Sequence, residues 1–227
     1  MKRFWTNVSV DAERVVRLDD RPVRTPGRVP LALPTPALAE AVAGEWRDVG
    51  EAVDPRAMPL TGLANAAIDR IGADPAPFAD GLARYAESDL LCYRADSPPE
   101  LVERQDAVWN PLLDWARDRY DVHFTNVTGI MHRPQPEATV ERLAQAVAAL
   151  DPFRLAALSP VVTITGSLVL ALALLEDAAD ADTIWTAAHV DEDFQAEQWG
   201  EDYLAVEARE AKRREFDAAV RFLKALG

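Results

Sequence analysis

Ten carboxylate side chains, and no lysine or arginine, fall between residues 176 and 202. Such a run usually forms a solvated helix face with basic partners nearby. Trp185 and Trp199 lie on one stripe of a helix predicted over 182–200, and the consecutive acids of 191–193 span about 200° of that helix. At least one carboxylate must therefore approach the aromatic stripe, where it needs an internal arginine or a cation from another protein.

The same region suggests a metal site, because histidine and carboxylate side chains bind divalent ions. His189, Asp191 and Asp193 diverge by about 200° at each step, so they converge on one ion only if the helix is broken. His123 and His132 flank an apolar segment and are more typical of loop residues than of a catalytic pair. A metal-dependent hydrolase stays an alternative function. We predict no catalytic residue, no metal and no cofactor.

Composition narrows the choice of partner. No dinucleotide-binding, phosphate-binding, nucleophile-elbow or zinc-protease motif occurs. The lone cysteine, Cys92, follows two leucines and is predicted to be a buried thiol rather than a nucleophile. The net charge of −14 disfavours nucleic acid and anionic membranes as partners. Because the apolar stretch 161–175 is shorter than the roughly 20 residues of a membrane span, and no secretory signal is evident, we expect a cytoplasmic protein.

The N-terminal region predicts strands followed by helices. Over 8–33, turn residues separate short apolar segments, and apolar residues repeat every second position from 29 to 33. Helices with one apolar stripe each are predicted over 36–49 and 59–71. A few short strands need a covering layer, which these helices can provide.

From residue 75 onward the pattern is helical. A capping box is predicted at Ser97, and a further helix start at Ser159-Pro160. The helix after that start is apolar on every side, so other helices must surround it. The amphipathic helices 182–200 and 203–226 complete the chain.

The predicted fold class is α+β with two domains. Residues 1–74 form a small domain of antiparallel strands plus two helices, and residues 75–227 form a larger, all-helical domain. We expect a monomer, because the apolar stripes are matched within the chain and the remaining surface is heavily charged.

Several blocks of the sequence resemble a known family of assembly chaperones, which handle the alpha subunit of the catalytic head of F-type ATP synthase. The matching blocks are Leu18-Asp19-Asp20-Arg21-Pro22-Val23-Arg24-Thr25-Pro26, Glu45-Trp46, Met58-Pro59-Leu60-Thr61, Leu63-Ala64-Asn65-Ala66-Ala67-Ile68-Asp69-Arg70, Asp89-Leu90-Leu91-Cys92-Tyr93-Arg94, Trp109-Asn110-Pro111-Leu112-Leu113-Asp114-Trp115-Ala116, Thr165-Gly166-Ser167-Leu168, and Asp191-Glu192-Asp193-Phe194-Gln195 with Trp199-Gly200. They run almost end to end in the family's order.

The resemblance implies a non-enzymatic chaperone. It would hold the unassembled alpha subunit, prevent its aggregation and hand it over to the beta subunit. Mitochondrial relatives carry a targeting extension that is not evident here, so this chain is more similar to a bacterial member. The family's functional acidic position matches Asp191, with Glu192 beside it. Phe194, Gln195 and Trp199 would add contact area. A generic acidic binding module for another basic partner is the remaining alternative.

Overall fold

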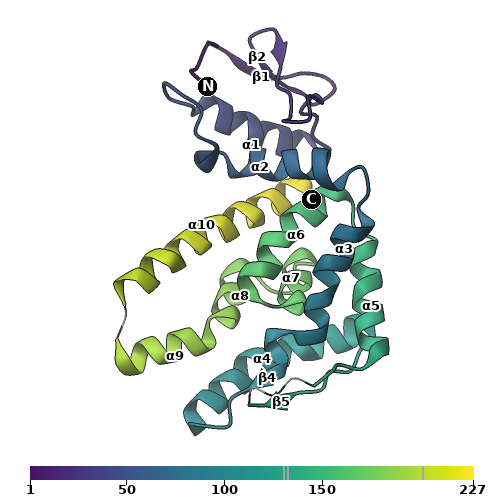
Figure 1. The fold of residues 1–227 in the computed structure, drawn as a ribbon, viewed down its shortest axis with the longest axis vertical. Helices are drawn as coiled ribbons and strands as arrows, with labels where there is room; N and C mark the ends of the chain where they lie inside the picture. Colours follow the sequence, from purple (N-terminus) through teal and green to yellow (C-terminus); the bar gives the residue numbers. More distant parts are fainter. Residues whose placement is uncertain (130, 132, 201) are drawn as a thin grey trace. The chain divides into compact units, whose positions relative to one another are not determined.

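The computed structural model describes residues 1–129, 131, 133–200 and 202–227. The chain forms two compact units (Figure 1). The first contains residues 1–75, 151–157 and 217–227, and the second contains residues 76–150 and 158–216. Within the described part of the chain, no helix combines the length and the apolar character needed to cross a membrane.

The first unit begins with a three-stranded antiparallel sheet. Its strands pair in chain order: β1 (Val8–Val10), β2 (Val16–Leu18) and β3 (Arg21–Pro22). The alternation predicted over 29–33 is confirmed for Leu31 and Leu33, which are buried, but Val29 is exposed. This stretch forms isolated bridges rather than a strand, at Arg24–Pro30 and Val15–Ala32.

Both helices predicted for this unit are confirmed. They are α1 (Pro36–Arg47) and α2 (Pro59–Ala66), with a 3-10 turn at Pro55–Ala57 and a π-helical turn at Ala67–Ile71. Thr35 caps α1 by accepting from the Leu38 amide at 3.1 Å. The Glu45 carboxylate accepts from the amides of Leu60 and Thr61, each at 2.7 Å. It therefore satisfies donors at the start of α2 that have no partner within their own helix.

Residues from far along the chain complete the core of the first unit. Ala157, from the first part of α6 (Pro152–Thr165), and Phe222, near the end of α10 (Tyr203–Leu226), are buried in its apolar cluster. Thr35 Oγ1 also donates to the Ala225 carbonyl at 2.6 Å. The domain boundary after residue 74 stays a proposal. Residues 151–157 and 217–227 belong to the same compact unit as the N-terminal region.

The second unit is mainly helical, as predicted. Its remaining elements are α3 (Ala76–Ala83), 3-10 turns at Arg84–Ser88 and Leu90–Cys92, β4 (Tyr93–Arg94), α4 (Pro99–Tyr120), β5 (Val127–Thr128), α5 (Glu137–Ala148), α7 (Leu168–Leu175), α8 (Ala181–Ala188) and α9 (Val190–Trp199). The two-residue strands β4 and β5 pair in parallel.

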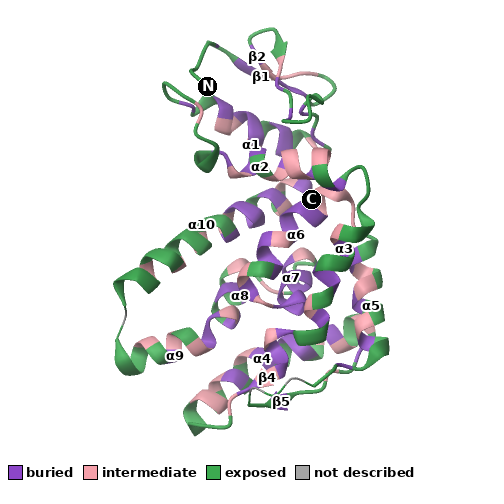
Figure 2. Cartoon of the chain, in the orientation of Figure 1, coloured by how far each residue is buried: buried purple, intermediate pink, exposed green. Residues whose placement is uncertain are grey.

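Helix α7 is the apolar centre of the second unit. All of its residues from Leu168 to Leu174 are buried, and it packs against α4 and α8 (Figure 2). The prediction that other helices surround the apolar helix is confirmed. Asp89 is also buried, and its carboxylate accepts from the amides of Leu91 and Val169 at 3.1 and 3.0 Å. This carboxylate fixes the start of α7 to the 3-10 turn at Leu90–Cys92.

Two predicted helix starts are wrong in detail. Pro160 lies inside α6, and the chain breaks instead at Gly166, whose φ of +66° ends the helix before Ser167 caps α7. Helix α4 begins at Pro99 without a capping box, because the Ser97 hydroxyl bonds to Asp96 instead. In both cases a polar residue before proline was compatible with a cap, but its local neighbours provided another arrangement.

Candidate functional site

The acidic region around residue 191 is built from two helices, not from the single helix predicted over 182–200. Helix α8 ends at Ala188, and α9 begins at Val190. His189 has non-helical dihedrals (φ −119°, ψ 17°), and its ring stacks on Trp185 with centroids 4.0 Å apart. Its Nδ1 faces the Trp185 carbonyl at 2.8 Å. The predicted stripe from Trp185 to Trp199 is therefore wrong, because the two tryptophans lie on different helices.

Asp191 is held from within the second unit. Its Oδ1 accepts from Gln105 Nε2 at 2.6 Å, and Asp191 is half-buried. Gln105 is only 1 % exposed, and its Oε1 accepts from the Ala95 amide at 2.8 Å. The first turn of α9 is thus fastened to α4 through a buried side-chain amide whose two ends are both occupied.

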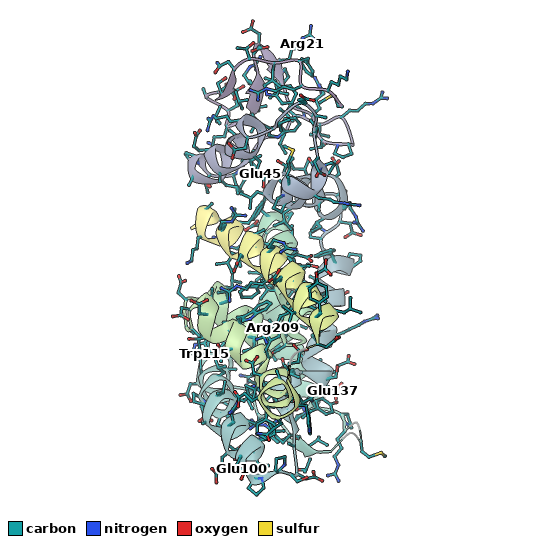
Figure 3. All side chains as sticks on the ribbon, turned by 90° about the vertical axis from the view of Figure 1, so that its left-hand side faces the viewer. Arg21, Glu45, Glu100, Trp115, Glu137 and Arg209 are labelled. Carbon is teal, nitrogen blue, oxygen red and sulfur yellow. The ribbon has the colours of Figure 1, made fainter. Side chains whose placement is uncertain are left out.

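Two arginines fasten the rest of α9. Arg209 of α10 (labelled in Figure 3) pairs with Asp193 at 2.6 Å. Arg104 of α4 makes two 2.8 Å hydrogen bonds to Glu197, which hold the pKa of that carboxyl below its ordinary value. The Arg104 guanidinium also lies 5.5 Å from the ring of Phe194, which is buried. Asp193 and Glu197 are thus each paired with an arginine of the same chain. The sequence allowed either such an internal arginine or a cation from another protein.

Glu192, Gln195 and Trp199 face solvent from the same helix. The Glu192 side chain is 59 % exposed, and its carboxylate lies 3.7 Å from His189 Nε2. Burial lowers the pKa of His189 below its ordinary value, so the ring is neutral near pH 7 and does not compensate the Glu192 charge. Figure 2 shows α9 and the first turns of α10 largely exposed. Of the five predicted partner-binding residues, these three are exposed.

Sequence reasoning named Trp199 but missed two further exposed apolar residues where α9 meets α10. Trp199 is 79 % exposed, and Tyr203 and Leu204, at the start of α10, are 77 % and 69 % exposed. Isolated apolar residues on a surface are ordinary, but three strongly exposed ones within six positions are unusual. Tyr203 and Leu204 stand well before the buried stripe of α10, which begins at Phe216 and became visible only in the structure.

The metal alternative gains no support from the geometry. Although the helix is broken at His189, no group of three or more histidine, cysteine, aspartate or glutamate side chains capable of holding an ion occurs among the described residues. His123 is exposed, and His132 lies outside the described residues. Cys92 is fully buried, and burial, with Asp89 nearby, raises the pKa of its thiol to about 12. A thiol in that state is a poor nucleophile near neutral pH.

Comparison with known proteins now decides the family. Residues 2–117, just over half of the chain, match the family model described as ATP12 chaperone protein. The chain belongs to the ATP12 chaperone family. The match covers the sheet and the helices through most of α4, and it ends before the acidic region of α8 and α9.

Relatives cover the remainder of the chain. The mitochondrial protein atp12 of Schizosaccharomyces pombe is 24 % identical over 96 % of this chain and 81 % of its own length. The mitochondrial protein ATP12 of Saccharomyces cerevisiae is 23 % identical over 98 % of this chain and 84 % of its own length. The ATP12 relationship therefore extends through the acidic region.

Solved bacterial structures give the same assignment. The crystal structure of Atp12 from Paracoccus denitrificans has 41 % sequence identity and a TM-score of 0.93, and the match covers 100 % of this chain and 98 % of the Paracoccus chain. An aspartate-to-lysine variant of that protein has a TM-score of 0.95, with the same coverage of both chains. A putative chaperone from Agrobacterium tumefaciens is also 41 % identical, with a TM-score of 0.94, over 100 % of this chain and 86 % of its own. The ATP12 fold, a small strand-containing part and a larger helical part, is therefore shown.

Proposed function

We propose that this chain is a non-enzymatic chaperone that binds the unassembled alpha subunit of the F-type ATP synthase catalytic head. It prevents aggregation of that subunit and releases it to the beta subunit. Membership of a family described as chaperones supports the general role. The single observation that carries the binding surface is α9, an acidic helix fixed on one side by internal contacts and exposed on the other.

The five predicted partner-binding residues take different parts in this proposal. Glu192, Gln195 and Trp199 are exposed and contact the alpha subunit directly. Phe194 is buried and contributes by holding α9 in place under Arg104. Asp191 is half-buried, and its bond to Gln105 sets the orientation of the first turn, from which Glu192 projects.

The chemistry of the helix suits a temporary contact. An unassembled ring subunit exposes apolar and charged interface that would otherwise aggregate. Carboxylates at the rim of an interface raise the encounter rate and fix orientation more than they raise affinity. An interface of modest area with these charges can be replaced by the larger surface of the final partner subunit. We also propose that the chaperone acts as a cytoplasmic monomer, without nucleic acid, membrane, metal or cofactor.

Co-expression with the host's alpha subunit tests the proposal. We expect the alpha subunit to stay soluble, to co-elute with this chain and to leave the complex when the beta subunit is added. Asp191→Lys should weaken the complex while the chain stays folded. Glu207→Lys, at an exposed position of α10, makes the same charge change and should leave binding unchanged. Aggregation of the alpha subunit with no complex at all would contradict the proposal.

A further inference from the structure

A surface hollow lies between α9 and the first half of α10. This α9–α10 hollow has a volume of about 410 Å³, and its lining includes Glu192, Ala196, Trp199, Ala205, Val206 and Lys212. Its size falls in the usual range for pockets that accept a ligand or a few side chains, about 300–1,000 Å³. All the lining residues belong to the second unit, so the hollow is a feature of one compact body.

The floor of the hollow is apolar. Small or aliphatic side chains, Ala196 on α9 and Ala205 and Val206 on α10, leave the space open between the two helices. The exposed apolar residues Trp199, Tyr203 and Leu204 stand where the two helices join. Large apolar side chains held in water beside an apolar hollow are a common feature of protein interaction sites.

The charged residues that line the hollow indicate the charge of the segment that it would bind. The charged residues of the lining are two carboxylates, Glu192 and Asp202, and two cations, Arg209 and Lys212. Arg209 is already paired with Asp193. Among the described residues, the ring of His189, which is neutral near pH 7, is the one basic group within 4 Å of the Glu192 carboxylate on the wall formed by α9. Glu192 therefore gives the α9 wall a carboxylate without a cationic partner, and this carboxylate attracts a positive side chain.

From this combination we propose that the α9–α10 hollow is the docking site for a short apolar segment of the alpha subunit that also carries a lysine or arginine. The apolar side chain enters the hollow between Ala196 and Val206, and Trp199, which also lines the hollow, covers it. The basic side chain pairs with Glu192. The inference rests on the proposed function and deepens it by naming the binding pocket and the kind of segment that it recognises.

Filling the hollow provides the sharpest test. Ala205 lines the hollow, whereas Ala211 is an exposed alanine of the same helix outside its lining. Ala205→Trp fills the hollow. Ala211→Trp places the same side chain on another face of α10, and neither substitution changes the charge of the chain. We expect Ala205→Trp to lower affinity for the purified alpha subunit at least about tenfold and Ala211→Trp to change it by less than about twofold. Equal effects of the two variants would overturn the docking site.

A second probe separates the docking site from the identity of the partner. Overlapping peptides of about 15 residues from the alpha subunit are labelled and titrated with the full chain. We expect the binding peptides to combine apolar and basic residues and to lose affinity with Ala205→Trp and with Glu192→Lys. If the whole alpha subunit forms no complex but such peptides behave in this way, the docking site stands and the proposed function fails.

The remaining outcomes overturn the docking site itself. Binding confined to acidic or purely polar peptides would be one of them. Dimerisation of the chain alone in sedimentation, if Ala205→Trp abolishes it, would assign the hollow to a second copy of the chain. In either case the proposed function would still be judged by co-elution with the alpha subunit.

Discussion

Gln105 Nε2 donates a 2.6 Å hydrogen bond to Asp191 Oδ1, so an almost fully buried residue of α4 anchors the first turn of α9. Asp191→Asn keeps an oxygen that can accept this bond, whereas Asp191→Lys does not. A buried amide without a partner costs about 1–3 kcal/mol, so we expect the free energy of unfolding to fall by about that amount in the Lys variant and by less in the Asn variant. Denaturant titrations measure both losses, and equal losses would contradict a positioning role.

The same pair of variants separates charge from position in binding. Asp191→Asn removes the charge but leaves Glu192 oriented by the first turn of α9. We therefore expect the Asn variant to retain most of its affinity for the alpha subunit and the Lys variant to lose it. An Asn variant as weak as the Lys variant would mean that the Asp191 carboxylate contacts the partner itself.

Gly27 allows the sheet region of the first unit to approach Asp69. The Asp69 carboxylate accepts from Thr25 Oγ1 and from the Gly27 amide, each at 2.7 Å. A Cβ at Gly27 would lie 2.6 Å from Asp69 Oδ1, so Gly27→Ala should displace this carboxylate and cost about 1–3 kcal/mol of unfolding free energy. Gly44→Ala, in open space within α1, should instead stabilise by about 0.4–1 kcal/mol. Thermal unfolding of the two variants gives the signs, and the same sign for both would refute the argument.

The fold could be predicted where local sequence determines it. Thr35 before Pro36 marks the start of α1, as predicted. Gly166 was a local signal that the prediction of one apolar helix after Pro160 did not use, because glycine adopts the positive φ that ends α6. The break at His189 had no such local signal, since neither glycine nor proline is present. Two contacts accompany it: the ring stacks on Trp185, four residues earlier, and Trp109 Nε1 donates to the Ala187 carbonyl at 2.7 Å. The second contact joins residues 78 positions apart, so the local sequence could not predict it.

The charge of the candidate site could be predicted from the sequence, but the residues that hold α9 in place could not. The acidic residues of α9 were visible as a run, but the pairing of Arg104 with Glu197 joins positions 93 residues apart. Gln105 offered one usable signal. It is a polar residue at the helical spacing of Leu101 and Trp109, and such a residue on an apolar stripe must find a buried partner. Which partner it finds depends on the packing of α9 against α4.

Cys92 should resist alkylation while the protein is folded. Burial raises the pKa of its thiol to about 12, so at about pH 8 the thiolate fraction is roughly a thousandfold below that of a free cysteine. We expect iodoacetamide to leave the folded chain unmodified over hours and to label it fully in denaturant. Mass spectrometry gives the extent of reaction. Rapid labelling without denaturant would mean that the 3-10 turn at Leu90–Cys92 opens easily.

His189 should make stability depend on pH. Burial lowers the pKa of the ring below the ordinary 6.5, and Arg209 lowers it further, against smaller opposing influences from the Trp185 carbonyl, Glu192 and Asp193. The unfolded chain therefore binds a proton more readily, and the stability contributed by the neutral ring is present above pH 6.5 and is lost as the pH falls through the lower folded value. Acidification should also loosen α9, because the ring forms the joint between α8 and α9.

A matched pair of variants measures this effect. His189→Gln removes the titrating ring from the joint, whereas His123→Gln removes an exposed histidine of the same unit. In denaturant titrations between about pH 7.5 and 5.5, we expect the loss of unfolding free energy to be smaller in His189→Gln than in the unmodified chain and unchanged in His123→Gln. Hydrogen exchange should show α9 amides opening first at the lower pH. If His189→Gln does not alter the pH dependence of the unfolding free energy, the ring takes up its proton equally well in the folded and unfolded chains.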